Sequence, residues 1–424
     1  MGEEAYEPAG WTWAGSHHFG ARGLARPRSV PDLSALVAAE PSIRAVGSRH
    51  SFTDIADSTG LMVSLDAIAE EPVLVRSHDL RFDQHVRVPA GMRYGELATW
   101  LHARGRALPN LASLPHISVA GAVATGTHGS GLRNGSLATA VTAIELVDGR
   151  GDLVRIEQTD PDFPGSVVAL GALGIVTHLE LATETTYAVT QTAHTGLTWA
   201  DMHAHAPSIL RAAYSVSIFT RWADEPDGSV ARVWTKSRGP APYLLGTTPA
   251  DQPLHVIPGL DPAPCTVQLG MPGPWHERLP HFRLDFTPSS GEELQSEYLL
   301  PFERTPEALA AVRSLAHRIR PLLMVGEVRA VAADDLWLSP AYGTDAVALH
   351  FTWLREPERV RALLPALEEL LLPLGARPHW GKLFAAGPAE LAAAYPRWHD
   401  FAQLVKQYDP EGRFGNAWLS RTLG

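Results

Sequence analysis

The stretch from Leu108 to Gly131 constrains the fold more than any other part of this sequence. It contains no Asp, Glu, Lys or Arg, and small residues and hydroxyls dominate it. A backbone with such small side chains can lie close against a large ligand whose phosphates are held by N–H and O–H donors. The interleaved Ile117, Val119 and Val123 favour a packed segment over the alternative of a flexible Gly/Ser loop. We therefore expect this stretch to wrap around a bound ligand.

A second candidate lies upstream, where the apolar run Ile43 to Val46 ends at Gly47-Ser48-Arg49-His50-Ser51-Phe52. A strand that stops at a Gly-Ser turn exposes backbone N–H groups that can face a phosphate, and His50 offers a nucleophilic ring nitrogen at the same place. Taken alone, such a turn is more often a plain turn with a structural histidine. Its function therefore depends on what the rest of the chain brings beside it.

Several common catalytic motifs are missing from the sequence. It has no G-x-G-x-x-G between a strand and a helix and no G-x-x-x-x-G-K-[ST], so neither a Rossmann fingerprint nor a P-loop is supported. It also lacks the G-x-S-x-G elbow of serine hydrolases. His203, His205, His276 and His281 invite a metal interpretation, but neither H-E-x-x-H nor paired C-x-x-C occurs. We expect no catalytic metal.

Composition indicates a globular protein with more than one structural unit. The chain has 424 residues, of which 45% are hydrophobic and 19% charged, and roughly 150 residues per domain predicts two or three units. The formal net charge of −11 argues against a nucleic-acid partner. The sequence contains no run of about 18 apolar residues, so we expect no membrane-spanning helix. An acidic N-terminus without the pattern of a secretory signal, and the single Cys265, lead us to expect a cytoplasmic protein.

The order of the apolar runs predicts an α+β fold with two domains. The first part of the chain alternates helices with short strands, and its beginning is typical of either an α+β or an α/β protein. It includes a predicted hairpin of Ala140 to Val147 with Leu153 to Ile156. After about Thr183, longer β-like runs and Pro-rich loops indicate a second α+β domain. This domain contains two predicted helices, Thr305 to Arg320 and Pro357 to Leu372, the first with Thr305 as its N-cap.

Two predicted strands of the second part carry polar residues on one face. Glu327 and Arg329 are two residues apart in one strand, and His350 and Thr352 have the same spacing in the other. A strand points each pair to one face and its apolar neighbours to the opposite face. The apolar faces predict a buried core, whereas the polar faces suit either a small-molecule cavity or solvent. The residues alone leave these two alternatives about even.

Taken together and in this order, the motifs resemble the vanillyl-alcohol-oxidase superfamily of FAD-dependent oxidases, and within it the bacterial alditol oxidases. Besides the two stretches above, four runs carry the resemblance: 272–283, 286–291, 337–343 and 377–382. The resemblance implies a two-domain fold. It places a PCMH-type FAD-binding domain at 1–183, an α+β substrate (cap) domain at 184–385, and a C-terminal segment at 386–424 that returns to the first domain.

The resemblance also implies that FAD is bound and that His50 is joined through its ring to the 8α-methyl of the isoalloxazine. Arg49 stands where the family often has glycine. The residues that the resemblance places around FAD, besides His50, are Ala45, Val46, Gly47, Ser48, Arg49, Ser51, Ser113, Ser118, Gly121, Thr125, Gly126, Thr127, His128, Val176 and His379. Those that it places around the substrate are Ser113, Glu327, Arg329, His350, Thr352 and Lys382.

The reaction that follows is oxidation of the terminal CH2OH of a polyol, such as xylitol or sorbitol, to an aldehyde, with hydride passing to FAD and O2 giving H2O2. His350 is the candidate base. Arg329 and Lys382 are the candidates for stabilising the alkoxide, and Ser113, Glu327 and Thr352 for holding further hydroxyls. An aldonolactone oxidase or dehydrogenase on the same fold is the alternative. We expect a polyol and O2 as partners, no nucleic acid or membrane, and a monomer.

Overall fold

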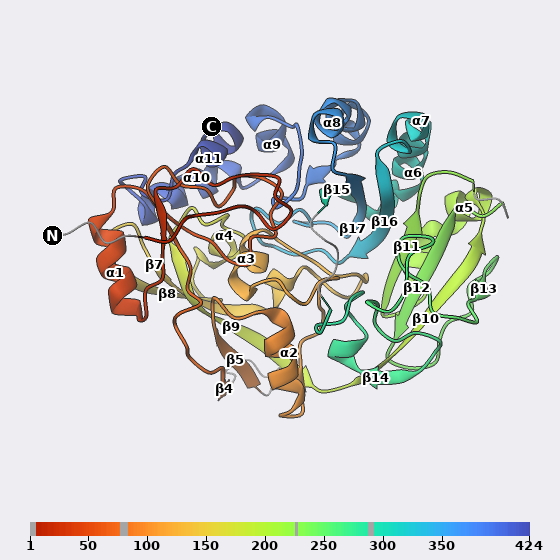
Figure 1. The fold of residues 1–424 in the computed structure, drawn as a ribbon, viewed down its shortest axis with the longest axis horizontal. Coiled ribbons are helices and arrows are strands. Elements are labelled where there is room, and N and C mark those ends of the chain that lie inside the picture. The colour runs from red at the N-terminus through yellow and green to blue at the C-terminus, as the bar shows by residue number, and fades with distance from the viewer. Residues whose placement is uncertain (1–5, 77–83, 225–227, 287–291) are drawn as a thin grey trace.

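The computed structural model describes residues 6–76, 84–224, 228–286 and 292–424. The part of the expected 286–291 motif that covers 287–291 lies outside the described residues. Strands in the described part form three sheets, with helices packed on and between them (Figure 1). The predicted α+β class is confirmed by this mixture of mainly antiparallel sheets and helices.

A small parallel sheet carries the turn that contains His50. Its strands are β1 (Gly23–Ala25), β3 (Leu61–Val63) and β2 (Ile43–Ala45), in the order β1-β3-β2. Helix α1 (Val30–Ala39) precedes β2 and begins after Ser29, whose side chain accepts a hydrogen bond from the backbone N–H of Asp32. Because α1 packs its buried residues against Ile43 in one apolar cluster, the end of β2 is held at a fixed place.

The second sheet builds the remainder of the N-terminal half. Its order is β4-β5-β9-β7-β8, and β6 pairs with β9. The strands are β4 (Val73–Arg76), β5 (Gln84–Pro89), β6 (Arg106–Ala107), β7 (Val141–Val147), β8 (Leu153–Glu157) and β9 (Ile175–Thr185). The accompanying helices are α2 (Tyr94–His102), α3 (Val119–Ala124), α4 (Phe163–Ser166) and the 3-10 turn η1 (Leu137–Ala140). The antiparallel pair β7–β8 confirms the predicted hairpin.

The third sheet has nine strands in the order β13-β10-β12-β11-β16-β17-β15-β18, with β14 paired to β10. The strands are β10 (Ala188–Leu197), β11 (Ser215–Thr220), β12 (Ala231–Ser237), β13 (Thr248–Pro249), β14 (Pro272–Pro274), β15 (Glu293–Pro301), β16 (Leu323–Val331), β17 (Ala346–Leu354) and β18 (Arg377–Pro378). The helices of this part are α5 (Trp199–Leu210), α6 (Thr305–Ser314), α7 (Ala316–Ile319), α8 (Pro357–Leu371) and the 3-10 turns η2 (Trp275–Glu277), η3 (Phe302–Arg304) and η4 (Leu372–Leu374).

The apolar face of the nine-stranded sheet is a core covered by helices. Val328 of β16 and Leu349 of β17 are aligned in register and wholly buried, and they belong to one cluster with residues of α5, α6 and α8. Figure 1 shows these helices on the side of the sheet that faces away from the other two sheets. The predicted buried face is therefore confirmed, and the polar face of the same strands turns toward the N-terminal half.

One predicted helix boundary is wrong. The expected helix Thr305 to Arg320 is broken at Leu315 into α6 and α7, and Thr305 is its first helical residue rather than its N-cap. The reason is the 3-10 turn η3 directly before α6. The Thr305 hydroxyl donates to the Phe302 carbonyl of that turn at 2.5 Å, so it does not accept from the first turn of the helix. The second expected helix agrees with α8 to within one residue.

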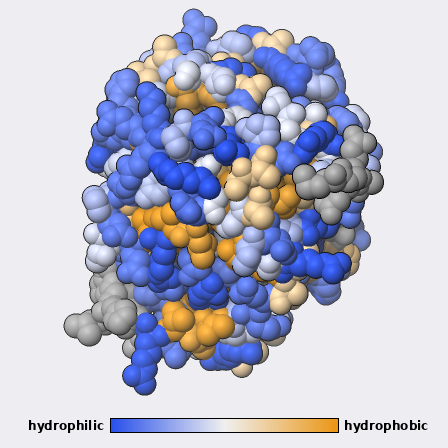
Figure 2. Space-filling view, turned by 90° about the vertical axis from the view of Figure 1, so that its left-hand side faces the viewer, coloured by the Kyte–Doolittle hydropathy of each residue, from blue (hydrophilic) through white to orange (hydrophobic). Residues whose placement is uncertain are grey.

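The C-terminal helices α9 (Pro388–Ala394), α10 (Trp398–Tyr408) and α11 (Ala417–Leu423) pack against the N-terminal half. Phe401 and Trp418 belong to the same apolar cluster as Phe163 of α4, and Figure 1 shows both chain ends on this side of the molecule. Seen from that side, the surface is mostly hydrophilic with separate apolar patches (Figure 2). In the part of the chain that the structure describes, no helix has the length and apolarity that crossing a membrane requires.

Candidate active site

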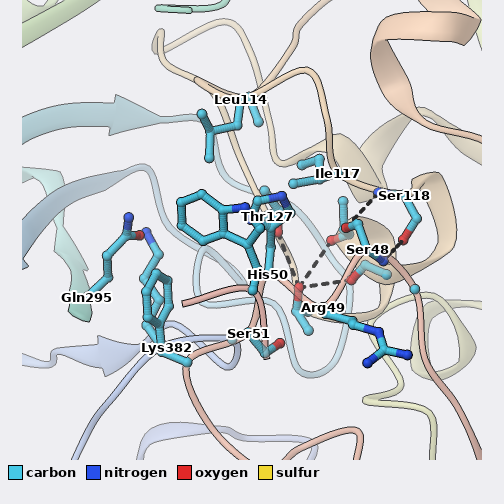
Figure 3. Close-up of a pocket in the computed structure, with 18 of the residues that line it drawn as sticks. Ser48, Arg49, His50, Ser51, Leu114, Ile117, Ser118, Thr127, Gln295 and Lys382 are labelled. Carbon is cyan, nitrogen blue, oxygen red and sulfur yellow. Dashed lines mark hydrogen bonds between the residues drawn. The ribbon is translucent and has the colours of Figure 1, made fainter. Parts of the chain in front are cut away.

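One large cavity of about 780 Å³ lies between the His50 turn, the wrapping stretch and the polar face of the nine-stranded sheet. Figure 3 shows His50 near its centre, with Lys382 and Gln295 on one side and Ser48 and Ser118 on the other. A backbone hydrogen bond from Phe52 N–H to the Gly381 carbonyl at 2.9 Å joins the His50 turn to the segment of Lys382. Residues more than 300 positions apart in the sequence therefore line the same space.

The turn after β2 needs glycine at position 47. A Cβ on Gly47 would lie 2.1 Å from the Ser118 hydroxyl oxygen, so any other residue here would force Ser118 to move. The close approach is fixed by a reciprocal pair of bonds, since Ser48 N–H donates to Ser118 Oγ at 3.3 Å and Ser118 N–H donates to Ser48 Oγ at 3.1 Å. This pairing, visible in Figure 3, leaves a narrow backbone-lined cradle of the kind that suits a phosphate.

Arg49 has a backbone conformation that glycine adopts more readily than other residues. Its φ is 64°, in the left-handed region, which costs a non-glycine residue of order 1 kcal/mol or more. The side chain extends away from Lys382 in Figure 3 and donates to the carbonyl of Ala9 at 2.5 Å. Its guanidinium carbon also lies 5.7 Å from the centre of the Phe19 ring. The N-terminal segment thus holds Arg49 and, through it, the orientation of the turn.

His50 presents a neutral ring to the cavity. Burial, followed by electrostatic repulsion from His116 and Arg93, lowers the pKa of His50 to about 4, so the ring carries no charge at neutral pH. The Trp13 ring packs against it, with the ring centres 4.7 Å apart, and Trp13 N–H donates to the Arg49 carbonyl at 2.8 Å. An unprotonated ring nitrogen at the cavity wall is the form that can act as a nucleophile.

The wrapping stretch lines the cavity with all but one of the residues that were predicted for the cofactor. Ser113, Ser118, Gly121, Thr125, Thr127 and His128 all contribute to its wall. Thr125 Oγ1 donates to the Gly121 carbonyl at 3.0 Å and lies 3.2 Å from Thr127 Oγ1. Gly126 does not line the cavity. It has a φ of 65°, and a Cβ there would meet Pro340 at 3.1 Å, so its glycine serves the turn.

The polar strand faces also line the cavity. In register, Glu327 of β16 pairs with His350 of β17, which pairs with Glu297 of β15. Residues directly opposite each other in paired strands share a face, so the three side chains form a row across the sheet. All three line the cavity together with Arg329, Thr352 and Lys382. The polar faces therefore turn into a cavity rather than toward solvent.

Glu297 is the centre of the charge cluster, and the sequence analysis missed it. Its side chain has no solvent exposure, and its carboxylate lies 2.5 Å from both Arg329 NH2 and Lys382 Nζ. Its oxygens are also 3.4 Å from His128 Nε2 and 3.6 Å from His350 Nδ1. The signal was present, because Glu293, Gln295 and Glu297 occupy every second position of β15 and so share one face, as the polar residues do in β16 and β17.

The pKa shifts follow from burial and from neighbouring charges. Burial alone raises the pKa of Glu297, but Lys382 and Arg329 outweigh it and hold that pKa well below its usual range. Burial of Glu327 is outweighed in the same way by Arg329 and by His281, so the pKa of Glu327 is lowered. Burial, aided by Lys382, lowers the pKa of His350 to about 4. The cluster thus contains two carboxylates and a neutral His350 at neutral pH.

The hydrogen bonds of His350 define its resting tautomer. Lys382 Nζ lies 2.8 Å from His350 Nδ1, and an ammonium group only donates. Nδ1 therefore accepts, the ring proton is on Nε2, and Nε2 donates to Thr352 Oγ1 at 3.0 Å. Arg329 NH1 reaches Ser113 Oγ at 3.4 Å, which links the strand cluster to the wrapping stretch.

Two further residues of the site were not predicted. His281 had been considered only as a possible metal ligand, yet its Nε2 lies 2.8 Å from Glu327 Oε1. Gln295 of β15 points into the cavity beside Lys382 (Figure 3). Among the residues that the structure describes, no three His, Cys, Asp or Glu side chains are grouped so that they could hold a metal ion.

The residues present fit an FAD molecule. With the exception of Gly126, every residue predicted for the cofactor or the substrate lines the same cavity, including Val176 of β9 and His379 beside Lys382. At one end stands the backbone cradle that a Cβ at Gly47 would fill, and at the other the buried charge cluster. A long ligand with a phosphate-bearing part and a reactive ring matches these two ends.

Comparison with known proteins agrees with this geometry. Residues 21–157 match the family of FAD binding domains, and residues 291–422 match the D-arabinono-1,4-lactone oxidase family. An alditol oxidase of a Streptomyces species is 46% identical over 97% of this chain and 98% of its own length. An L-gulono-1,4-lactone dehydrogenase of Mycobacterium tuberculosis is 28% identical, with 97% of this chain and 98% of the relative covered.

A solved structure supports the fold alone. A cholesterol oxidase from B. sterolicum superposes with a TM-score of 0.80 over 99% of this chain and 97% of that protein, at 14% sequence identity. The near full-length identity to the Streptomyces enzyme and the FAD binding domain match carry the assignment further. The chain therefore belongs to the alditol oxidase family, within the vanillyl-alcohol-oxidase superfamily of FAD-dependent oxidases.

Proposed function

We propose that this protein oxidises the terminal primary hydroxyl of alditols, such as xylitol and sorbitol, to the aldose, with O2 reduced to H2O2. The observation that carries the proposal is the row of Glu327, His350 and Glu297, which faces the same cavity as His50. The identity to a relative named an alditol oxidase supports the substrate class.

A polyol suits the polar end of the cavity better than a simple alkanol does. The buried Glu327 accepts hydrogen bonds, Arg329 and Lys382 donate them, and Thr352 does both. Each hydroxyl of a polyol can likewise donate and accept, so several of these groups can be satisfied at once. An alkanol has a single hydroxyl, so most of these groups would gain no hydrogen bond from it and we expect it to bind less well.

FAD, when bound, supplies a two-electron acceptor for the hydrogen on the substrate carbon and a route for these electrons to O2. The residues of the chain must handle the proton that the substrate hydroxyl loses. We assign this proton to His350 Nε2. His350 would act in the tautomer with its proton on Nδ1, 3.6 Å from Glu297 Oε2. The Lys382 ammonium would then turn from Nδ1 to the substrate oxygen, where it and Arg329 stabilise negative charge.

Covalent attachment of FAD to His50 is part of the same proposal. The neutral His50 ring at the cavity wall supports it, because an unprotonated imidazole nitrogen is the nucleophile that such a bond requires. Trp13 and the anchored Arg49 keep this ring in one orientation. We also retain as proposals a cytoplasmic location and a monomeric state.

A substrate panel tests the proposal. Purified protein is assayed with xylitol, sorbitol, 1-pentanol and L-gulono-1,4-lactone, with O2 and separately with an artificial electron acceptor, and H2O2 is measured. We expect the polyols to be oxidised with H2O2 formed, and 1-pentanol to be a poor substrate. Oxidation of the lactone without the polyols would instead support an aldonolactone oxidase or dehydrogenase, the alternative that the match at 291–422 favours. Polyol binding by a colourless protein would indicate a flavin-free sugar-binding protein.

A further inference from the structure

Two of the three lysines in this chain lie at the candidate site, Lys382 within it and Lys236 behind it. Lys236, on β12, is only 1% exposed. Its Nζ donates to the Leu279 carbonyl, to the Pro280 carbonyl at 3.3 Å and to His281 Nδ1 at 3.0 Å. Within the described ranges it forms no ion pair. Burying an unpaired ammonium is costly, so its contacts call for an explanation.

His281 connects this lysine to the cavity. Its Nε2 lies 2.8 Å from Glu327 Oε1, and both side chains are 7% exposed. The rings of Phe219 and Trp234 meet the imidazole edge-on, with ring centres 5.3 and 5.6 Å away. The backbone N–H of His281 donates to the Ser113 carbonyl at 3.0 Å. These contacts hold the imidazole against Glu327.

The donors in this chain of contacts have a fixed direction. The Lys236 ammonium only donates, so His281 Nδ1 accepts and the ring proton is on Nε2. Nε2 then donates to Glu327 Oε1 at 2.8 Å, which fixes the orientation of the carboxylate. The other oxygen, Oε2, lies 3.6 Å from Arg329 Nε and can accept from a ligand in the cavity.

We propose that Lys236 and His281 are positioning residues, which together hold the Glu327 carboxylate in place for a substrate hydroxyl. The inference rests on the proposed function, in which Glu327 contacts the polyol. Neither residue is assigned a contact with the reacting atoms. They act through Glu327, by fixing where its carboxylate oxygens point.

The chain of contacts from Lys236 through His281 to Glu327, here called the relay, has a pH dependence that a purely structural contact would lack. The titratable and charged groups that face Lys236 are His281, Glu327, Arg329 and Cys265. Burial lowers the pKa of Lys236 to about 7 and that of His281 to about 4, and it raises the pKa of the Cys265 thiol to about 11. Near neutral pH, Lys236 is thus the group in this set that loses its charge as the pH rises. A neutral amine can accept as well as donate, so the proton of His281 is no longer fixed on Nε2.

The first test replaces Lys236 by methionine, which keeps the length of the side chain and removes the donor. Lys406, exposed on α10, provides the matched control. At about pH 6 we expect Lys236→Met to raise KM for xylitol about tenfold, with kcat within about threefold. The wild-type KM should rise from about pH 6 to about pH 9, whereas that of Lys236→Met should stay flat. Lys406→Met should behave as wild type, and flavin absorbance per protein verifies folding in each variant.

The second test uses His281, so that a poorly folding Lys236 variant does not end the experiment. In His281→Gln the amide oxygen can accept from Lys236 and the NH2 can donate to Glu327, whereas His281→Leu can do neither. We expect His281→Leu to raise KM about tenfold and His281→Gln to recover most of this loss. Equal KM values for the two variants, or a Lys236→Met enzyme with wild-type KM and pH profile, would overturn the relay.

Glu327→Gln separates the failure of the relay from the failure of the proposed function. A wild-type KM for xylitol in Glu327→Gln would refute the substrate contact of Glu327, and with it the relay. A raised KM in Glu327→Gln together with wild-type behaviour of both the Lys236 and His281 variants would refute the relay alone. If all three act as one unit, the KM of the double variant Lys236→Met/Glu327→Gln should be close to that of Glu327→Gln.

Discussion

Replacing Glu297 by glutamine tests the charge balance of the site with almost no change in side-chain volume. Arg329 and Lys382 contribute two positive charges, and Glu297 and Glu327 two negative ones, so the substitution leaves one buried charge uncompensated. Removing one partner of a buried ion pair costs about 3–5 kcal/mol. At an unfolding entropy of about 2.1 cal/mol/K per residue, this loss lowers the Tm of a protein of this length by about 3–6 °C.

The same substitution should change the pH dependence of turnover. Burial lowers the pKa of Lys382, and the charge of Glu297 acts in the opposite direction. Without Glu297 the pKa of Lys382 falls further, so its ammonium is lost at a lower pH. Since the proposed mechanism needs that positive charge beside the substrate oxygen, kcat/KM for xylitol should begin to fall at a lower pH in Glu297→Gln than in wild type.

The assay is O2 consumption with xylitol from about pH 5 to about pH 10, combined with thermal melting followed by flavin fluorescence. Glu297→Asp retains the charge and should keep the wild-type alkaline limb, although a shorter side chain reduces kcat. Glu369→Gln, the same change at an exposed position on α8, is the matched control. An unchanged Tm and an unchanged alkaline limb in Glu297→Gln would refute the role of Glu297 as the counter-ion of Lys382.

Three further predictions follow from the site and the fold. Lys382→Met and Arg329→Ala should each lower kcat for xylitol by at least about a hundredfold while the protein stays yellow, because each removes a group that stabilises developing negative charge. Normal turnover in both variants would contradict the assigned site. Lys406→Met serves as the control for the lysine change. Wild-type protein precipitated with acid should retain its flavin in the pellet, whereas His50→Ala should release it to the supernatant; flavin in the wild-type supernatant would contradict a covalent bond. Arg44→Met should lower the free energy of unfolding, measured with urea, by about 3 kcal/mol or more. The reason is that the buried Arg44 guanidinium donates to carbonyls of three chain segments, among them Leu170 at 2.8 Å and Phe414. A loss below about 1 kcal/mol would show that water can replace those bonds.

Local patterns in the sequence were sufficient for the elements that bear the site. The alternation of polar and apolar residues in β16 and β17 predicted which side chains share a face, because a strand reverses side-chain direction at every residue. The same argument applied to β15 would have found Glu297. The charge-free stretch around Ser118 predicted a close backbone approach, and the 2.1 Å gap between a Cβ at Gly47 and the Ser118 hydroxyl shows how close it is.

Other features depended on contacts that no local pattern contains. The helix boundary at Thr305 was placed one residue wrong because a 3-10 turn precedes α6. Gly126 was expected at the cofactor but serves a left-handed turn against Pro340. The resemblance to a known family, rather than the pattern of the residues, was what placed Lys382 near the polar strands.

The sequence by itself determined that the chain mixes helices and strands, that two of its strands have one apolar face, and that a glycine turn presents His50. Period-two alternation and turn chemistry are local properties, so they can be read from neighbouring residues. Only the tertiary structure decided whether the polar faces meet solvent or a cavity. That outcome depends on strand order and register, which align Glu327, His350 and Glu297 and bring Lys236 and His281 behind them. The electrostatics of the site follow from this burial, because a charge between strands far apart in sequence acquires its partners only when the sheet forms.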